Sequence, residues 1–506
     1  MKSTARRNRE PQPKETDATP TQALRPGLLV GVLVAVVLFA GGVYFALMRM
    51  QPGLNEPFAE PEQVAIAEGE PKVVDKPSDS GDMANAALLA IVRARGEAMP
   101  LPPKLLTKPN EEEKFWYVGM PSTESLVEIP FMPGLAPGPP PQDAPLHANP
   151  GFLGADACKD CHREKYDSFI HTSHHLTSSL ATPESVMGSF ELGRNLMQSV
   201  NPDVKFTMVE RDSRLYQRVD FYGWQFEVPF DIVFGSSKLA QTFLFWNFDA
   251  LYQMNVTYLA TNDQWVNSPG YIDGDAAYAR PIGTRCFECH TTYAEVRERP
   301  NRYTPSSVIF GISCERCHGP GASHVEYHRA NPGAKVGYDM TVPSKLSRER
   351  ELDVCGQCHS GASPLKKPPY SFRPGDRLDD FYEPLPPEKI ANSVHVSNQA
   401  VRLSLSKCFK QSDMSCSTCH DPHRNERGKL DVYSARCMEC HSQENCGEFA
   451  RMGERIKENC IDCHMPNEST VHLPFDSPEG KVFPPLRDHH VRIDEKATQK
   501  FRETKK

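Results

Sequence analysis

The chain has 506 residues, 24% of them charged, and a formal net charge of −8. Such an acidic balance gives no sign of the basic surface that nucleic-acid binding needs, so no nucleic-acid partner is expected. The 16 cysteines exceed the needs of a single thioredoxin-like site, and disulfide frameworks of that density are typical of much smaller exported domains.

The first predicted element is a transmembrane helix at 27–48, a stretch of 22 residues without charge. A spanning helix needs about 20 such residues, whereas the apolar part of a cleaved signal peptide is about 7–15 residues long. Basic residues outnumber acidic ones in 1–26, so that segment is expected in the cytoplasm. The sequence therefore predicts a single-pass inner-membrane protein whose remainder lies in the periplasm; a cleaved signal peptide is the alternative.

Residues 49–150 are rich in proline, glutamate and alanine and predict an extended tether. Within it, 82–97 is Ala- and Leu-rich and could form one helix. The aromatic residues at 115–117 are expected to pack on the folded domain that follows.

The region 151–492 contains seven Cys-x-x-Cys-His motifs. Numbered one to seven in chain order, they are Cys158/Cys161/His162, Cys286/Cys289/His290, Cys314/Cys317/His318, Cys355/Cys358/His359, Cys416/Cys419/His420, Cys437/Cys440/His441 and Cys460/Cys463/His464. Two thiols at this spacing can add across the two vinyl groups of one porphyrin, and the adjacent histidine then binds the iron. Zinc ribbons use cysteine pairs two at a time and require nothing of the next residue, which does not fit seven pairs. The motifs predict seven covalently bound haem c groups.

Between motifs one and two, residues 176–285 contain no cysteine and alternate apolar with polar residues around turn signals such as Asp212-Ser213. This pattern predicts a β-rich insertion built of hairpins. Motifs two to seven then follow closely, leaving too little chain for an ordinary hydrophobic core around each site. We expect a mostly α and irregular fold with a haem-packed core, longer helices from an N-cap at Ser344 to Cys358 and at 448–458, and a charged tail at 493–506.

Eleven histidines lie outside the motifs and are candidates for the second axial ligand of each iron. They are His147, His171, His174, His175, His324, His328, His395, His423, His472, His489 and His490. His423 follows His420 by three residues across Asp421-Pro422, a loop that stays on the proximal side of its own ring. His423 is therefore expected to bind the iron of a neighbouring haem.

Several segments resemble the periplasmic multihaem cytochromes grouped with tetrahaem cytochrome c-554, which are related to hydroxylamine oxidoreductase and pentahaem nitrite reductase. The similar segments are Phe169-Ile-His-Thr-Ser-His174, Cys314-Glu-Arg-Cys-His-Gly-Pro-Gly-Ala-Ser-His324, Cys416-Ser-Thr-Cys-His-Asp-Pro-His423 and Cys460-Ile-Asp-Cys-His-Met-Pro. The resemblance covers roughly 157–492 and implies that His174, His324 and His423 are distal ligands. It also favours His395, His472 and His489, whereas His175, His328 and His490 would only pack nearby.

Two cysteines remain outside the motifs, Cys408 and Cys446. In an oxidising compartment they could form one disulfide, or they could remain as buried thiols. A third alternative is that Cys408 binds a haem iron as an axial ligand.

Two functions fit these observations. The first is electron transfer between a membrane donor, such as a quinol oxidase, and a periplasmic acceptor, such as another cytochrome. The second is a multihaem oxidoreductase acting on a small nitrogen or sulfur species at one open iron. The haem of motif two is the best candidate for that open iron, because no histidine occurs in 176–289 or 291–317, on either side of its own His290. Tyr258, Trp265 or Tyr278 could then line its distal face. The alternative is a distal ligand from the C-terminal region, such as His490. All seven motifs end in histidine, which favours electron transfer, since pentahaem nitrite reductases have lysine at the catalytic haem.

Overall fold

The computed structural model describes residues 104–107, 114–120, 125–132, 134–386, 391–469, 474–477 and 480–504. The expected membrane anchor at 27–48 and the expected helix at 82–97 lie outside these ranges. No helix within the described ranges is both long enough and apolar enough to cross a bilayer.

The segment expected to be a tether contains three strands, β1 (Lys104–Thr107), β2 (Lys114–Met120) and β3 (Ser125–Ile129), which pair antiparallel in that order. The side chains of the aromatic residues at 115–117 are not described. Ile129, Phe131 and Met132 are buried, and Ile129 and Phe131 belong to the largest hydrophobic cluster. The folded part therefore begins before residue 150, because these apolar side chains join its core.

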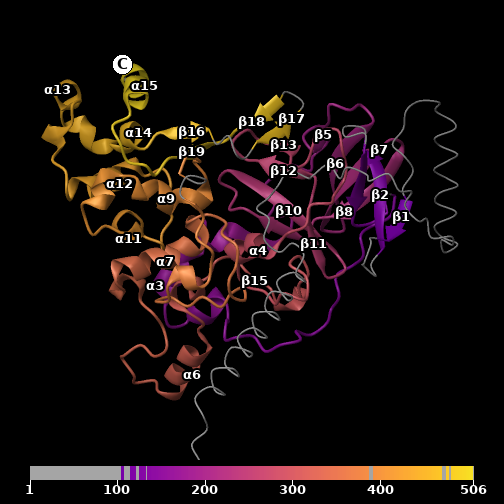
Figure 1. Cartoon of the computed structure of the whole chain (residues 1–506), viewed down its shortest axis with the longest axis horizontal. Helices are drawn as coiled ribbons and strands as arrows, with labels where there is room; N and C mark the ends of the chain where they lie inside the picture. Colours follow the sequence, from indigo (N-terminus) through magenta and orange to yellow (C-terminus); the bar gives the residue numbers. More distant parts are fainter. Residues whose placement is uncertain are drawn as a thin grey trace, which may run out of the picture. The chain divides into compact units, whose positions relative to one another are not determined.

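The cysteine-free segment forms two antiparallel sheets (Figure 1). One is a meander of β5 (Leu196–Gln198), β6 (Val204–Arg211), β7 (Arg214–Phe221) and β8 (Trp224–Pro229). The other has the order β13-β12-β10-β9-β4, with β11 also on β10; its strands are β4 (Ser178–Leu180), β9 (Ile232–Phe234), β10 (Ala240–Asn247), β11 (Ala250–Gln253), β12 (Val256–Leu259) and β13 (Gln264–Asn267). Asp212 and Ser213 both have positive φ, as the two-residue turn between β6 and β7 requires.

Strand β10 connects the sheets to the motif region, because its alternating side chains enter two different cores. Phe243 and Phe245 pack in the cluster shared by the two sheets. Leu244 and Trp246 point the other way, into a cluster that contains Phe287 of motif two. One face of the sheet thus holds motif two in place.

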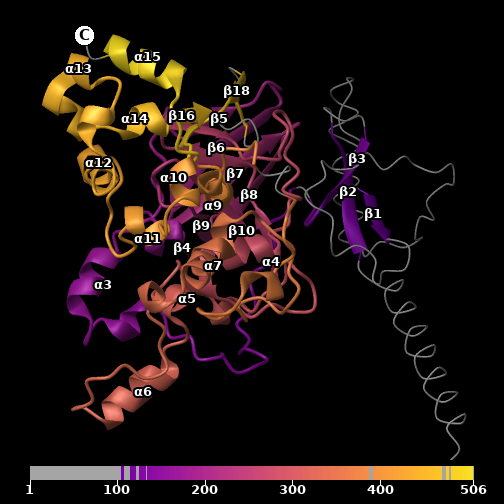
Figure 2. The same ribbon diagram turned by 60° about the vertical axis from the view of Figure 1, so that its left-hand side comes forward.

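The motifs themselves lie on short helices and turns (Figure 2). The helices are α3 (Arg163–Phe169), α4 (Thr284–His290), α5 (Glu315–His318), α6 (Ala322–Ala330), α7 (Arg348–His359), α9 (Gln399–Ser404), α10 (Lys407–Lys410), α11 (Cys416–Cys419), α12 (Leu430–Met438), α13 (Phe449–Met452), α14 (Ile461–His464) and α15 (Glu495–Thr504). The 3₁₀ turns are η1 (Ala155–Cys158), η2 (His175–Thr177), η3 (Pro305–Ser307), η4 (Pro343–Lys345), η5 (Leu378–Asp380), η6 (Val396–Asn398), η7 (Gln443–Asn445) and η8 (Gly453–Glu458). Three strand pairs complete the fold: β14 (Thr291–Tyr293) with β15 (Ile309–Phe310), β16 (Asn467–Ser469) with β19 (Pro485–Arg487), and β17 (Phe475–Ser477) with β18 (Gly480–Val482).

Two expected helices differ in detail from those observed. Helix α7 is capped by Ser347, whose side chain accepts a hydrogen bond from the backbone of Arg350, while Ser344 lies in η4. Pro343 favours that preceding turn, so the helix starts later than expected. The segment 448–458 is divided into α13 and η8, because Gly453 has positive φ and ends the first helix.

The segment that carries motifs five to seven has few apolar side chains to pack. Between residues 391 and 469, the described chain buries only four hydrophobic side chains: Val394, Ile456, Ile461 and Cys463. None of them belongs to a hydrophobic cluster. Burial of protein side chains against one another therefore contributes little to the stability of this segment.

Candidate haem-binding site

Each motif is built on a single helical turn. In motifs one, three, five, six and seven, the backbone N–H of the histidine donates to the carbonyl of the first cysteine at 2.9–3.2 Å. A turn of this kind places residues three apart on one face, so both thiols face the same side. In motifs two and four the same residues lie at the C-terminal ends of α4 and α7.

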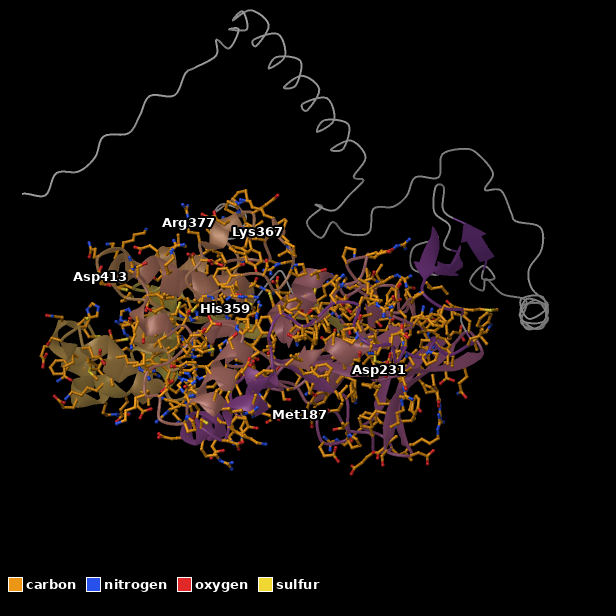
Figure 3. All side chains as sticks on the ribbon, turned by 90° about the horizontal axis from the view of Figure 1, so that it is seen from below. Met187, Asp231, His359, Lys367, Arg377 and Asp413 are labelled. Carbon is orange, nitrogen blue, oxygen red and sulfur yellow. The ribbon has the colours of Figure 1, made fainter. Side chains whose placement is uncertain are left out.

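Four motif histidines face a second histidine from elsewhere in the chain at a similar distance. The ring centres are 6.3 Å apart for His162 and His324, 6.1 Å for His318 and His423, 6.2 Å for His359 and His174, and 6.0 Å for His420 and His489. Figure 3 shows His359 among the motif helices, with Asp231 among the strands. Each pair joins segments that are distant in sequence or belong to different motifs.

This spacing fits a metal ion bound between two imidazole rings. An imidazole nitrogen bonds a transition metal at about 2.0–2.1 Å, and its ring centre lies roughly 1.1 Å further back, so opposed rings would have centres about 6.3 Å apart. Parallel rings stacked directly on each other lie closer, as Phe234 does on His290 at 4.3 Å and 5°. Among the described residues, no group of three or more His, Cys, Asp or Glu side chains is arranged to hold a metal ion by itself.

One ring of every pair is held in the tautomer that a metal ligand needs. The Nδ1 atoms of His318 and His359 donate to the carbonyls of Thr341 and Val396 at 2.7 and 2.8 Å. His324 and His489 make the same bond to Tyr338 and Arg487, at 2.8 and 3.3 Å. Because a carbonyl can only accept, Nδ1 carries the proton and Nε2 keeps its lone pair free.

The electrostatic surroundings keep two of these rings neutral. Desolvation lowers the pKa of His174 to about 4, with further lowering by His359 and His420. Burial likewise lowers the pKa of His489 to about 4, assisted by His420. A neutral imidazole is the form that binds a metal, so neither ring must lose a proton at neutral pH.

Neighbouring motifs contact one another through their cysteines. The thiols of Cys158 and Cys314 form a hydrogen bond that raises the pKa of the first and lowers that of the second. Two further contacts of the same kind join motifs two and four, through Cys289 and Cys358, and motifs four and five, through Cys355 and Cys416.

Weaker electrostatic interactions complete the connection. Cys355 interacts with Cys317, and Cys437 interacts with both Cys419 and Cys460. Motif one therefore adjoins three, three adjoins four, four adjoins two and five, and five continues through six to seven. All seven motifs form one connected series.

Motif two differs from the four paired motifs. The Nδ1 atom of His290 lies within hydrogen-bonding distance of the Thr177 hydroxyl and carbonyl, and Phe234 stacks on the ring at 4.3 Å and 5°. Within the described ranges, no second histidine ring faces His290. Tyr258, Trp265 and Tyr278, which the sequence suggested for the distal face, instead pack in the core between the sheets, whereas Cys286 packs on the other cluster.

Motifs six and seven also lack an opposed histidine ring within the part of the chain that the structure describes. His464 is fixed through Nδ1 by the carbonyl of Arg492 at 2.9 Å. Of the expected distal ligands, His472 lies outside the described residues, and His395 bonds the hydroxyl of Ser397 through Nδ1. The ligands expected at His395 and His472 therefore remain predictions.

Six of the expected attachment and ligand residues are exposed, namely Cys161, His162, His174, His420, Cys440 and His441. The thiols of Cys161 and Cys440 are exposed, whereas the other 14 cysteines are at least partly buried, and the side chain of His441 is exposed as well. The reason is their place in the fold, since Cys161 lies in the turn between η1 and α3, and Cys440 and His441 follow the end of α12. The chain alone does not enclose these residues, and the expectation that porphyrin rings supply the core around the motifs remains a prediction. Their roles in haem binding remain predictions, and haems attached there would have an edge toward solvent.

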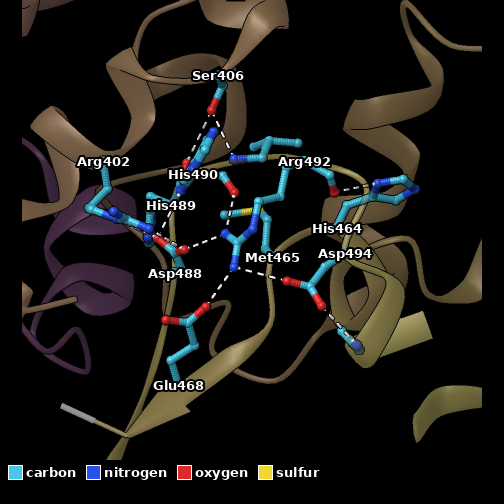
Figure 4. A network of polar contacts seen from close by, with 12 residues as sticks. Arg402, Ser406, His464, Met465, Glu468, Asp488, His489, His490, Arg492 and Asp494 are labelled. Atoms are coloured by element: carbon cyan, nitrogen blue, oxygen red, sulfur yellow. Dashed lines mark hydrogen bonds and ion pairs between the residues drawn. The ribbon is translucent and has the colours of Figure 1, made fainter. Parts of the chain in front are cut away.

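The segment after β19 that supplies His489 is fixed by a buried ionic network (Figure 4). The fully buried carboxylate of Asp488 pairs with Arg402 at 2.6 Å and with Arg492. Burial by itself would raise the pKa of Asp488, but hydrogen bonds from Arg402, the His490 backbone and Arg492 lower it to about 2. The sequence analysis did not identify Asp488; its position directly before His489 was the only signal.

Cys408 and Cys446 do not pair with each other, and all 16 cysteines are free thiols in the structure. Cys408 lies near Cys419 and Cys437, and Cys446 lies near Cys460 and Cys463. They thus belong to different motif neighbourhoods, which disfavours a disulfide between them.

Comparisons with known proteins agree with this site. The family model described as cytochrome c554 and c-prime matches residues 268–319, which include motifs two and three. The chain is 25% identical over 208 residues to the multihaem cytochrome MtrA of Shewanella baltica, covering 38% of this chain and 48% of that protein. It is 20% identical over 387 residues to the dissimilatory sulfite reductase MccA of Wolinella succinogenes, covering 62% and 50%.

The chain thus spans about half the length of these two relatives. Among solved structures it is similar to the outer cell wall cytochrome OcwA. The TM-score is 0.45 at 17% identity, over 69% of this chain and 81% of that one.

Proposed function

We propose that this chain is a multihaem c-type cytochrome that carries electrons through seven covalently bound haems, supported by its motifs and by its similarity to a cytochrome family model and to the multihaem cytochrome MtrA. The observation that carries the proposal is the connected series of seven motifs, in which cysteines of adjacent motifs interact electrostatically. When bound, haem supplies reversible one-electron chemistry at iron. The protein contributes the attachment, the axial ligands and the short separations between motifs.

The motifs and the histidine pairs support an assignment of the residues that would hold each haem. The two cysteines of each motif attach the haem, and the motif histidine is its proximal ligand. We assign His324, His423, His174 and His489 as distal ligands for motifs one, three, four and five, because these rings face the proximal ones at 6.0–6.3 Å. Iron held between two imidazole ligands would change its coordination little when its oxidation state changes, which suits electron transfer.

A haem-packed core also accounts for the shortage of buried apolar side chains around motifs five to seven. The porphyrin rings would supply the apolar surface that the chain itself does not. The fold of this segment would then depend on haem attachment. We propose a mostly helical and irregular haem domain next to a β-rich insertion.

The exposed attachment residues fit the same function. A haem held by Cys440 and His441 of motif six, or by Cys161 of motif one, would lie close to the surface at two separate places in the series. Electrons must enter and leave such a series through haems that a partner protein can approach. We propose these two haems as the points of exchange with redox partners.

Compartment and partners are part of the same proposal. Haem c is attached outside the cytoplasm, and the uncharged stretch at 27–48 would anchor the chain in the inner membrane with its haem domain in the periplasm. A membrane quinol oxidase is the expected electron donor, and a periplasmic cytochrome is the expected acceptor. The acidic net charge of −8 would favour partners with basic surfaces.

A second candidate function rests on motif two, where no described histidine ring faces His290. An iron open to small ligands there would allow reduction or oxidation of a small nitrogen or sulfur species. Dissimilatory sulfite reductase MccA is one relative whose name describes such an activity.

Protein-film voltammetry of the purified holoprotein distinguishes the two functions. An electron carrier gives reversible signals that added nitrite, hydroxylamine or sulfite leaves unchanged. A catalytic current that grows with one of these substrates would instead support the oxidoreductase. Absence of any reversible signal from a protein with seven haems would contradict the electron-transfer proposal.

A further inference from the structure

Motifs two, three and four each contribute one residue to a buried cluster, the second of the two residues that lie between their cysteines. These residues are Glu288, Arg316 and Gln357. The guanidinium of Arg316 lies 3.9 Å from the carboxylate of Glu288, and the Gln357 amide donates to the Arg316 carbonyl at 3.3 Å. Three motifs that are far apart in sequence thus contact one another through side chains that attach no haem.

The cluster holds more positive than negative charge. Arg285, directly before motif two, also pairs with Glu288 and donates to the carbonyl of Gln357 at 2.7 Å. The side chains of Arg285, Arg316 and Glu288 are 14%, 4% and 1% exposed. Two guanidinium groups therefore share one buried carboxylate.

The surrounding groups do not cancel this excess. The hydroxyl of Tyr382 and the backbone N–H of Tyr370 donate to Glu288 at 2.9 and 3.0 Å, which stabilises its carboxylate. The rings of these two tyrosines lie under Arg285 and Arg316, at 4.4 and 5.4 Å. A third cation, Arg373, lies close by but interacts with its own carboxylate, Asp376.

The cluster lies beside the haem attachment points of motifs two and four. The pKa of the Cys358 thiol is lowered first by its hydrogen bond with Cys289, and then by Arg316 and Arg285. In a buried environment such charges act strongly on a neighbouring redox centre.

The first residue between the cysteines of motif three is negatively charged, unlike Arg316, and faces motif one instead of motifs two and four. Glu315 is 2% exposed and accepts hydrogen bonds from the backbone N–H groups of Leu153, Gly154 and Gly321 at 2.7–2.8 Å. It interacts electrostatically with Cys158 and Cys314, the attachment points of motifs one and three. Motif three thus presents a buried anion toward motif one and a buried cation toward motifs two and four.

We propose that these two adjacent residues, Glu315 and Arg316, set a stepped reduction potential that draws electrons from the haem of motif one toward those of motifs two and four. The inference rests on haem attachment as proposed above. Reduction removes positive charge from the iron, so a buried cation favours the reduced state and a buried anion favours the oxidised state. The haems beside Arg316 therefore hold electrons more readily than the haem beside Glu315.

Redox titrations of holoprotein variants, followed by optical and paramagnetic resonance spectroscopy, test the proposal. The titration should contain seven one-electron reduction steps. In Arg316→Gln, one or two of them should move to lower potential by about 59 mV, which corresponds to a tenfold change in the reduction equilibrium constant for one electron. Glu288→Gln should shift the same steps to higher potential, and the double variant should return toward wild type. Arg163→Gln is the matched control, because that arginine follows His162 directly but is 70% exposed.

Potential shifts of opposite sign in Arg316→Gln and Glu288→Gln indicate a charge effect, because structural damage would shift the potentials of both variants in the same direction. Shifts of the same sign, or unshifted potentials in a protein that keeps seven haems, would overturn the inference. If Arg316→Gln loses haem, the sign of the shift in Glu288→Gln decides. Failure of the proposed function appears differently, as haem missing from the intact mass of the wild type.

Discussion

Replacing His423 by alanine removes the ring that faces His318 and tests the assignment of distal ligands. The two ring centres are 6.1 Å apart at an interplanar angle of 25°, so the iron of motif three would lose one of its two axial ligands. About one seventh of the haem should therefore change from low spin to high spin. The covalent attachment at Cys314 and Cys317 is untouched, so the count of seven haems should not change.

The fold should tolerate this change. The side chain of His423 is 32% exposed, and its only described ion pair is a 3.4 Å contact with Asp421. Truncation of a partly exposed side chain of this kind should cost about 0.5 kcal/mol of unfolding free energy. A spectral change in His423→Ala would therefore reflect ligation rather than unfolding.

Paramagnetic resonance of the oxidised protein, together with carbon monoxide titration of the reduced protein, measures the outcome. The variant should bind one more equivalent of carbon monoxide than the wild type. His171→Ala is the control, because His171 is exposed and faces no motif histidine among the described residues. A wholly low-spin spectrum, or loss of a haem, would refute the reasoning.

Three further predictions follow from the same geometry. Reduced wild-type protein should bind about one equivalent of carbon monoxide, at motif two, because no described histidine ring faces His290, whereas His395 and His472 remain the expected ligands for the irons of motifs six and seven; absence of binding would remove the oxidoreductase alternative. Asp488→Asn should lower the unfolding free energy by about 3 kcal/mol, measured by denaturant unfolding, because Arg402 is left buried without its carboxylate; a loss below about 1 kcal/mol would contradict the role of the network. The pKa of Asp488 is lowered from 3.8 to about 2 in the folded state, so its stabilisation is present above pH 3.8 and is lost as the pH falls toward 2. The stability difference between wild type and Asp488→Asn should therefore shrink over that interval, and a difference that is independent of pH would show that ionisation of Asp488 is not involved.

The attachment residues were predictable from sequence because their chemistry requires a fixed local spacing. Cys-x-x-Cys-His forms one helical turn regardless of the rest of the fold, so each motif identifies its own cysteines and proximal histidine. Hairpins such as β6 and β7 were predictable for a similar reason, since alternation and the Asp212-Ser213 turn are local signals. The exposure of Cys161, Cys440 and His441 was not predictable, because the motif pattern is the same whether or not another segment covers it.

The pairing of histidines across the fold was not predictable from local spacing. His174 faces His359 of motif four, and His489 faces His420 of motif five, although long segments of sequence separate them. Their partners depend on how loops cross between motifs, which no periodicity encodes. The expectation that His423 serves another motif agrees with its position opposite His318, because that inference used a loop of only three residues.

The charged residues between the cysteines were overlooked because the Cys-x-x-Cys-His pattern allows any residue at those two positions. Glu315 and Arg316 lie between two cysteines and look interchangeable in the sequence. In the fold, both are buried and point to different neighbours. Similarly, the aromatic side chains Tyr258 and Trp265 were expected at motif two but pack between sheets, because alternation along β12 and β13 directs them to that core.

Coulometric reduction of the purified protein under anaerobic conditions tests the central claim most directly. If seven haems form one connected series, seven electrons per chain should equilibrate, and the haem absorption should change in proportion to the charge delivered. A protein that accepts five electrons or fewer, or that contains haems which remain oxidised at low potential, would contradict the account.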